Sequence, residues 1–556
     1  MRTLLNPLAL LRGLARTWEA IRAQGPGEVQ FWFIALAVGI ASALAAVTFR
    51  LGIIWLQSTV YGADDIRVIH SFAATLPWWL VLSVPVLGGL AVGLILHHFT
   101  PDARVRSVAD VIEGAALKEG RVEKREGLAS AAASLITLST GGSTGREGPV
   151  VHLAGVIATW VSDRINASGL TARDLLGCAV AAAVSASFNA PIAGTIFALE
   201  VVLRHYAVHA FAPIVIASVA GTVISRSVFG DVAEFDLVDD EMLAFYVELP
   251  AFLLLGLLSG LVAITQMRAI FWTDAVGTQL TRRSGLPRWM RPAVAGLLLG
   301  AIAIAYPHII GVGYETTGLA LTGQLTFTQA VIFVIVKVAA VAVTMGGRMG
   351  GGVFSPSLMI GALTGLAFGH VAVGLFPDVS GNVTLYALAG MGAVAAAVLG
   401  APISTTLILF ELTGDWQTGL AVMVAVSTST AIASRAVHKS FFLTQLENRG
   451  IHLAAGPQAY LMSLLTVSGL MRPKDSPRAA SEAACRELIE QGVWITRGDT
   501  LETAMPIFER EGHAFLPVAH RPPSGAEPDL LGALFQVDAL KAYNRALADT
   551  AAEEHS

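Results

Sequence analysis

Two short turns that contain glycine and proline are the parts of this sequence best suited to chemistry. Residues 145–149 read Gly-Arg-Glu-Gly-Pro and residues 352–356 read Gly-Val-Phe-Ser-Pro, and each turn leads into an apolar stretch. Proline suits the first turn of a helix. The free N–H groups of that turn, together with the helix dipole, attract anions. We therefore expect two helix N-termini to converge on one anion. Ordinary capping of packed helices is the alternative for either turn taken alone.

Glu147 lies inside the first turn and could change the state of such a site. A carboxylate within a membrane segment is costly and indicates function by default. At a helix N-terminus the carboxylate can itself occupy the anion site, and protonation would remove its charge and release the site. Glu147 would then be both a gate and a proton carrier. The alternative is a structural salt bridge between Glu147 and Arg146.

The two turns belong to an internal repeat. Ala-Pro-Ile at 190–192 precedes Glu200, and Ala-Pro-Ile at 401–403 precedes Glu411 at the same spacing, so the halves are offset by 207–211 residues. Residues 227–247 contain six carboxylates and no Lys or Arg, whereas residues 268–291 contain five arginines. By the positive-inside rule the first loop is outside and the second is a loop on the inside. The repeat is therefore inverted, an architecture in which transporters bind substrate near the midplane.

The elements that position these residues are membrane helices. Of 556 residues, 54% are apolar and 14% charged, and the mean hydropathy is +0.64, whereas roughly 25% of residues are charged in typical globular proteins. Many apolar segments are shorter than the ~20 residues of a full span, and such half-spans are tolerated where they line a cavity. The sequence predicts an all-α polytopic transporter or channel. A net charge of -5 without a long basic run gives no sign of nucleic-acid binding. Cys178 and Cys485 are too few for a disulfide framework and are not spaced like a metal site.

Three regions are expected. Residues 1–29 carry four arginines among leucines and predict a cytoplasmic amphipathic helix. Residues 30–445 form the transmembrane domain, with repeat halves of about 30–226 and 246–436. Residues 446–556 hold 25 charged residues in 111, close to the soluble norm, and predict a small cytoplasmic α+β domain. Both termini would be cytoplasmic, and the class of protein indicates a bacterial inner membrane.

The motifs resemble a known family. The run 145–152, Gly-Arg-Glu-Gly-Pro-Val-Val-His, is similar to the second signature of the CLC chloride channels and transporters, and 352–356 is similar to their third. Phe-Asn-Ala-Pro at 188–191 and the Glu411 helix match the same family, over roughly residues 30–450. The resemblance implies a membrane homodimer with one anion path per subunit and Glu147 as the gating glutamate. It also implies a chloride site made by the backbone amides of Gly148, Val353 and Phe354.

Two positions of the anion path depart from the family pattern. The first signature, Gly-Ser-Gly-Ile-Pro, is degraded to Arg-Ser-Val-Ala-Asp at 106–110. Either Ser107 or Arg106 fills the place of the anion-binding serine, and Ser107 is preferred. The central tyrosine of the family aligns with Phe442, whose ring cannot donate a hydrogen bond to chloride. Phe442 can form an apolar constriction, and plain helix packing is its alternative.

A third departure bears on mechanism. Exchangers of the family usually carry two adjacent glutamates at the end of the Asn-Ala-Pro helix, and the second relays protons. This chain has Glu200-Val201, and valine carries no proton. We therefore expect a passive voltage- or pH-gated chloride channel, with a chloride/proton antiporter as the alternative. Glu200 has either a pathway role or a structural one.

The tail resembles one degenerate cystathionine-β-synthase-type (CBS) module that opens with a strand at 464–471. The usual nucleotide-binding Ser/Thr, three residues before Asp538, is Phe535, so the resemblance implies no cofactor and favours a folded stabiliser of the dimer. A membrane enzyme is a remote alternative, because Gly-Gly-Ser-Thr-Gly at 141–145 matches a hydrolase elbow, but no strand precedes it. A ligand sensor with a vestigial pore is the second remote alternative.

Overall fold

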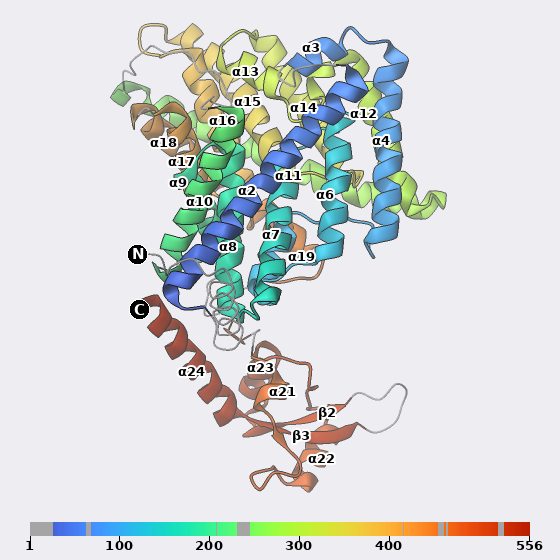
Figure 1. The fold of residues 1–556 in the computed structure, drawn as a ribbon, viewed down its shortest axis with the longest axis vertical. Coiled ribbons are helices and arrows are strands. Elements are labelled where there is room, and N and C mark those ends of the chain that lie inside the picture. The colour runs from blue at the N-terminus through green and yellow to red at the C-terminus, as the bar shows by residue number, and fades with distance from the viewer. Residues whose placement is uncertain are drawn as a thin grey trace, which may run out of the picture. The chain divides into compact units, whose positions relative to one another are not determined.

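The computed structural model describes residues 26–62, 68–206, 208–230, 245–414, 416–453, 461–462, 465–520 and 528–555. The chain divides into two compact units, one ending at Ile451 and one beginning at His452. The expected amphipathic helix at 1–29 lies almost wholly outside the described residues, since the first described helix begins at Glu28. Figure 1 shows the first unit as a bundle of helices.

The first unit contains both repeat halves. The elements of the first half are α2 (Glu28–Tyr61), α3 (Ile69–Ala73), α4 (Trp78–Phe99), α5 (Val108–Leu117), α6 (Lys124–Ser139), α7 (Glu147–Arg164), α8 (Gly169–Phe188), α9 (Pro191–Phe197), the π-helix η2 (Ala198–Leu203) and α10 (Val208–Phe229). In Figure 1, α2 runs obliquely across α6, α7 and α8, and it packs against all three.

The second half repeats the pattern of long and short helices. Its elements are α11 (Phe245–Ser284), the 3-10 turn η3 (Arg288–Met290), α12 (Arg291–Ala305), the 3-10 turn η4 (Pro307–Ile309), α13 (Tyr314–Leu321), α14 (Phe327–Gly346), α15 (Phe354–Leu375), α16 (Val383–Leu399), α17 (Pro402–Thr413), α18 (Trp416–Val437) and α19 (Phe441–Glu447).

The expected all-α membrane architecture is confirmed. Among the described residues, nine helices are long and apolar enough to cross a bilayer, and α9–η2, α16 and α17 are shorter apolar helices. One expectation was wrong in part: residues 268–284 belong to α11, not to a loop. This helix continues because its basic end holds no proline, and it stops before Gly285, whose φ of +67° is left-handed.

Glycines let neighbouring helices approach to backbone contact. An added Cβ at Gly365 of α15 would lie 2.0 Å from the carbonyl oxygen of Tyr386 in α16, and at Gly361 it would lie 2.3 Å from that of Gly390. Small residues four apart drive helix association in lipid, where burial of apolar surface contributes little. The α15–α16 pair is therefore fixed by van der Waals contact, and α15 begins at the second Gly-Pro turn.

The second unit is a small α+β domain. Its elements are α21 (Val467–Leu470), β1 (Arg472–Pro473), α22 (Glu482–Glu490), α23 (Leu501–Glu511), β2 (Phe515–His520), β3 (Asp529–Phe535) and α24 (Gln536–His555). The strands form an antiparallel sheet in the order β1-β3-β2. Apolar side chains of α23, β2 and β3 share a core with Val467. The expected opening strand at 464–471 was wrong, because 467–470 is helical. An isolated bridge between Thr466 and Thr500 precedes this helix, and the sheet itself begins at Arg472.

Candidate functional site

The two Gly-Pro turns meet through a reciprocal pair of backbone hydrogen bonds. The Gly145 N–H donates to the Gly352 carbonyl at 2.7 Å, and the Gly352 N–H donates to the Gly145 carbonyl at 2.7 Å. An added Cβ at Gly148 would lie 3.0 Å from the Cα of Gly352. The expected convergence of α7 and α15 at their N-termini is therefore present. Only residues without a side chain permit so close a crossing.

Glu147 places its carboxylate at the N-terminus of α15. The Ser355 hydroxyl donates to Oε1 of Glu147, and the Ser355 N–H donates to Oε2 at 3.4 Å. The side chain is buried, with 4% of the residue exposed. The Ser355 N–H is one of the groups that would otherwise face an anion. The carboxylate thus binds donors at the helix N-terminus where the sequence predicts a bound anion.

Arg146 is the nearest cation to this carboxylate, but it makes the looser contact. Its Nε lies 3.9 Å from Oε1 of Glu147, while its Nη2 donates to the carbonyl oxygen of Ser187 at 2.9 Å. The guanidinium also lies over the ring of Tyr314, 5.3 Å from the centroid. The salt bridge weighed as the alternative for Glu147 is therefore present beside the Ser355 contact and does not replace it.

A buried lysine supports the loop that carries Tyr314. Lys337 of α14 is fully buried, and its Nζ donates to the carbonyl oxygens of Ile309 and Gly311 at 3.2 and 3.1 Å. No carboxylate pairs with it among the described residues. Its partners are backbone carbonyl oxygens, so the Lys337 amine fixes the backbone just before α13. Lys337 was not among the predicted site residues, although a charge inside an apolar helix is a signal that could have found it.

Val353 and Phe354 lie at the N-terminus of α15, as the resemblance to the third signature implies. Val353 is the N-cap, and Phe354 is buried with its ring 4.6 Å from that of Phe188 and 6.3 Å from that of Phe197. These rings come from the end of α8 and from α9. The amides of the second turn are thereby held against the Asn-Ala-Pro segment of the first half.

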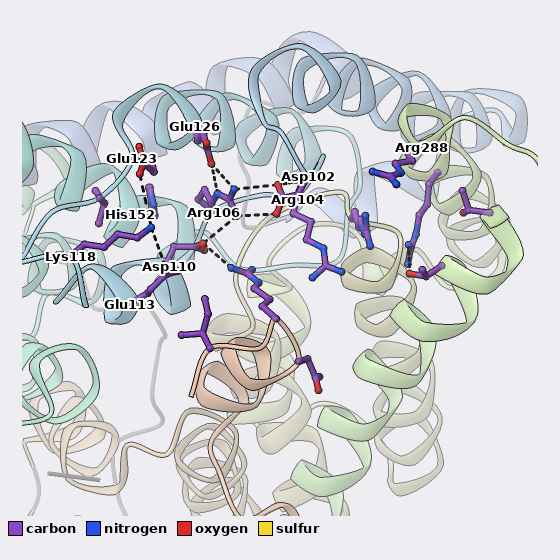
Figure 2. A pocket seen from close by; sticks show the side chains of 18 of the residues that line it. Asp102, Arg104, Arg106, Asp110, Glu113, Lys118, Glu123, Glu126, His152 and Arg288 are labelled. Atoms are coloured by element: carbon purple, nitrogen blue, oxygen red, sulfur yellow. Dashed lines mark hydrogen bonds and ion pairs between the residues drawn. The ribbon is translucent and has the colours of Figure 1, made fainter. Parts of the chain in front are cut away.

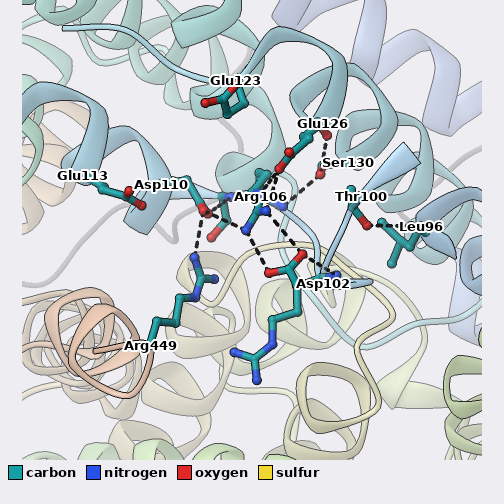
Figure 3. Close-up of polar contacts among 12 residues, drawn as sticks. Leu96, Thr100, Asp102, Arg106, Asp110, Glu113, Glu123, Glu126, Ser130 and Arg449 are labelled. Carbon is teal, nitrogen blue, oxygen red and sulfur yellow. Dashed lines mark hydrogen bonds and ion pairs between the residues drawn. The ribbon is translucent and has the colours of Figure 1, made fainter. Parts of the chain in front are cut away.

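Ser107 and Arg106 have different surroundings. Ser107 is the N-cap of α5, and its N–H donates to Oδ2 of Asp110 at 2.8 Å. Its residue borders a small cavity with Gly350, Gly351 and Phe441. Arg106 instead contacts the carboxylates of Asp102, Asp110 and Glu126, and this network is drawn in Figure 3. The geometry favours Ser107 for the position of the family serine, the preference drawn from sequence.

Asp110 ties α5 to the helix that carries the two phenylalanines. Its Oδ1 accepts from Nη1 of Arg449 at 2.8 Å, just beyond the end of α19 (Figure 3). Burial acts to raise the pKa of Asp110, but Arg449, His152 and the Ser107 N–H hold that pKa below its ordinary value. Charge pairing therefore positions α5 where the family signature relies on glycine and proline.

Phe442 is buried at the start of α19. The aromatic side chain from α19 that lines the cavity beside Ser107 is Phe441, whose ring stacks on Phe271 at 5.2 Å. The rings of Phe441 and Phe442 lie 5.8 Å apart, edge to face. A role for Phe442 as a constriction stays a prediction, and Phe441 joins it as a lining residue that the alignment did not indicate.

Glu200 and Glu411 cap each other's helices. The Glu200 carboxylate accepts from the N–H groups of Ile403 and Ser404 at 3.0 and 2.8 Å, at the start of α17. The Glu411 carboxylate accepts from those of Ile192 and Ala193 at 2.9 and 2.7 Å, at the start of α9. The two caps are equivalent contacts in the two halves of the inverted repeat. The capping contacts of Glu200 support the structural one of the two roles considered for it. Val201 is buried in the π-helix η2.

A larger cavity adjoins the one beside Ser107. It has a volume of about 610 Å³ and shares Arg104, Arg348 and Arg449 with its neighbour. Figure 2 shows charged side chains of both signs around it, with Arg288 and Glu123 among those labelled. This cavity was not predicted from the sequence. Arg348, a charge set in the glycine-rich run 346–352, was the signal that could have found it.

Comparison with known proteins indicates the same family as the sequence motifs. A family model described as voltage gated chloride channel matches residues 88–434, more than half of the chain. The chain belongs to the CLC family. The assignment makes it a channel or transporter of the membrane and not an enzyme. The matched residues include both Gly-Pro turns and both Ala-Pro-Ile motifs.

Individual relatives are similar over most of the first unit. A protein of Ralstonia nicotianae named as a ClcB-like chloride channel protein is 32% identical, over 72% of this chain and 92% of its own length. The voltage-gated ClC-type chloride channel ClcB of Escherichia coli is 31% identical, over 74% and 97%.

Solved structures show the same fold. A slow cyanobacterial Cl⁻/H⁺ antiporter has a TM-score of 0.67 at 20% identity, covering 76% of this chain and 98% of its own. A eukaryotic CLC transporter has a TM-score of 0.65 at 18% identity, covering 94% and 98%. CLC relatives are thus named as both channels and antiporters, so membership alone does not choose between the two.

Proposed function

We propose that this CLC protein conducts chloride passively through a path set by its paired Gly-Pro turns, with the carboxylate of Glu147 as the gate. The observation that carries the proposal is the position of that carboxylate at the N-terminus of α15. An anion and the carboxylate compete there for the same N–H groups. Protonation of Glu147 removes its charge, weakens its hold on Ser355 and opens the site to chloride.

Passive conduction is favoured over proton exchange by the surroundings of Val201. An exchanger needs a proton path from the second membrane face to Glu147, and the aliphatic Val201 offers no group for it. The neighbouring Glu200 is engaged by the N-terminus of α17 through two N–H groups and the Ser404 hydroxyl. Releasing Glu200 for proton transfer would leave those donors without an acceptor.

The test is chloride efflux from liposomes that hold the purified full chain, with external pH recorded at the same time. Valinomycin clamps the voltage, and the efflux is measured with and without a pH gradient. We expect chloride to leave without protons moving against their gradient. Uphill proton movement driven by a chloride gradient, abolished in Glu147→Gln, would overturn passive conduction and identify an antiporter. Absence of chloride efflux would contradict anion transport itself.

For assembly, we propose a homodimer in a bacterial inner membrane with both termini in the cytoplasm. Ile192 of α9 and Ile403 of α17 follow the paired prolines of the repeat, and they are 55% and 50% exposed. These outward apolar side chains at matched repeat positions support a contact between two copies.

For the tail, we propose a folded domain of CBS type that binds no nucleotide. Arg472 donates from Nε to Oδ2 of Asp538 at 2.7 Å, and its guanidinium lies 4.0 Å from the ring centroid of Phe535. The aspartate and the aromatic ring at the position of the usual Ser/Thr are thereby engaged within the domain.

A further inference from the structure

The 610 Å³ cavity has a strongly uneven distribution of charge. We call it the basic vestibule; its charged lining consists of Asp102, Arg104, Arg106, Asp110, Glu113, Lys118, Glu123, Glu126, Arg282, Arg288, Arg291, Arg348 and Arg449, joined by His152. Cations outnumber carboxylates by eight to five in that set. In Figure 2 the carboxylates gather around Arg106 and Lys118, whereas Arg288 lies apart from them.

The five carboxylates form ion pairs with three of the cations. Arg106 contacts Asp102, Asp110 and Glu126, and Arg449 also contacts Asp110. Lys118 contacts Glu113 and Glu123 at 3.0 and 4.0 Å. This part of the lining therefore carries five carboxylates against three cations, and its ion pairs hold α5, α6 and α19 in place.

The remaining charged lining consists of five arginines, and the carboxylate that pairs with three of them, Asp274, borders the neighbouring small cavity. Arg104, Arg291 and Arg348 all lie within 4.0 Å of the single carboxylate of Asp274, at 3.7, 2.9 and 3.4 Å. Arg282 and Arg288 have no ion pair among the described residues, and both are exposed. Like charges gathered in this way repel one another, and a bound anion would relieve the repulsion.

Two buried donors on the lining residues lack acceptors. The Nε atoms of Arg291 and Arg449 are buried without a hydrogen-bond partner in the described part of the chain. Arg291 is 7% exposed as a residue, and the Arg449 side chain is 11% exposed. A buried N–H without an acceptor is costly, but neither atom is accessible from the cavity, so only the other nitrogens of these guanidinium groups could meet a ligand there.

The five arginines of the lining indicate what kind of ligand the cavity could bind. A guanidinium presents a planar fork that matches phosphate oxygens in pairs. Attracting monovalent chloride does not require five such groups, and the volume lies in the range of small-molecule sites, about 300–1,000 Å³. We propose that the basic vestibule binds a soluble polyvalent phosphate anion, of di- or triphosphate size, through Arg104, Arg282, Arg288, Arg291 and Arg348.

The location gives the bound anion an effect on transport. The basic vestibule shares Arg104, Arg348, Asn448 and Arg449 with the small cavity that reaches Ser107, Gly350 and Phe441. An anion bound there lies at the mouth of the chloride path and slows the passage of chloride. This effect rests on the proposed transport function, whereas binding itself does not.

The test uses the purified full chain and inorganic pyrophosphate. Isothermal titration should show saturable binding, and the double variant Arg282→Gln/Arg288→Gln should weaken it at least tenfold. The matched control is Arg268→Gln/Arg283→Gln, which removes the same charge from α11 outside the vestibule and should leave binding unchanged. Absence of saturable binding, or an equal loss in both double variants, would overturn the proposal.

Efflux from liposomes tests the consequence. Pyrophosphate on both sides of the membrane should slow chloride efflux severalfold, more than sulfate at equal ionic strength, and the vestibule variant should not respond. Equal slowing by sulfate would indicate screening and overturn specific binding. Slowing in liposomes that contain phosphatidic acid, without added pyrophosphate, would assign the site to a lipid phosphate and overturn the soluble ligand. Absence of efflux without pyrophosphate would contradict transport, and titration would still decide the site.

Discussion

Ser355 determines how firmly the gate is held, because its hydroxyl and its N–H both donate to the Glu147 carboxylate. A hydrogen bond to a charged group contributes about 1.5–3 kcal/mol. Ser355→Ala removes the hydroxyl and keeps the N–H. We expect chloride to displace the carboxylate more easily, so that efflux at neutral pH rises by about three- to tenfold, a change of roughly 0.7–1.4 kcal/mol.

The control for this prediction is Ser143→Ala. Ser143 lies in the turn before Gly145, and its buried hydroxyl has no partner among the described residues. Its removal should leave efflux unchanged. Equal efflux in Ser355→Ala and the wild type would show that the hydroxyl contact does not set the gate.

The residue scale also shows what sequence reasoning could reach. Glu147 and the glycines were found because a charge in an apolar segment and a Gly-Pro turn are local signals. The Ser355 hydroxyl contact and the pairing of three arginines with Asp274 were not, since each depends on partners far along the chain. Lys337 carried the same local signal as Glu147, but the carbonyl oxygens that it binds lie 26 and 28 residues away.

At the scale of elements, Glu200 and Glu411 act as caps exchanged between α9–η2 and α17. Loss of a side-chain cap costs about 0.5–2 kcal/mol. Glu200→Ala should therefore lower the thermal midpoint of the purified protein by a few degrees, and Glu411→Ala should do the same. Neither should change the ratio of protons to chloride moved. A selective change in that ratio in Glu200→Ala would give Glu200 a place in a proton path.

The contact between α15 and α16 is a second property of elements. An added Cβ at Gly365 would lie 2.0 Å from a backbone oxygen of α16, whereas Gly374 in the same helix has open space around it. Overpacking costs about 1–3 kcal/mol. We expect Gly365→Ala to reduce the fraction of monodisperse protein after heating, and Gly374→Ala to leave it unchanged. Equal behaviour of the two variants would contradict the close packing.

At the scale of the whole molecule, composition and short apolar segments predicted the helical membrane unit, and the spacing of the paired motifs predicted its internal repeat. The loop charges led to a wrong end for α11, because the positive-inside rule reports the side of a basic segment and not its secondary structure. In the tail, the strand expected at 464–471 is a helix at 467–470 followed by a two-residue strand. A short apolar run does not distinguish strand from helix without its partners.

The proposed dimer makes a prediction at this scale as well. Ile192→Trp/Ile403→Trp adds bulk at the two exposed repeat positions and should shift the detergent-solubilised protein from dimer to monomer by light scattering. Leu298→Trp alters a comparably exposed side chain on α12 and should have no effect. A wild type that is already monomeric would contradict the dimer.

The central claim is that the Glu147 carboxylate and the anion compete for the N-terminus of α15. It is tested most directly by chloride efflux measured against pH for the wild type and for Glu147→Gln. We predict that wild-type efflux rises as pH falls, because protonation neutralises the carboxylate. Glu147→Gln should be fast at every pH, since its amide carries no charge. A variant as slow as the wild type, or equally dependent on pH, would contradict the account.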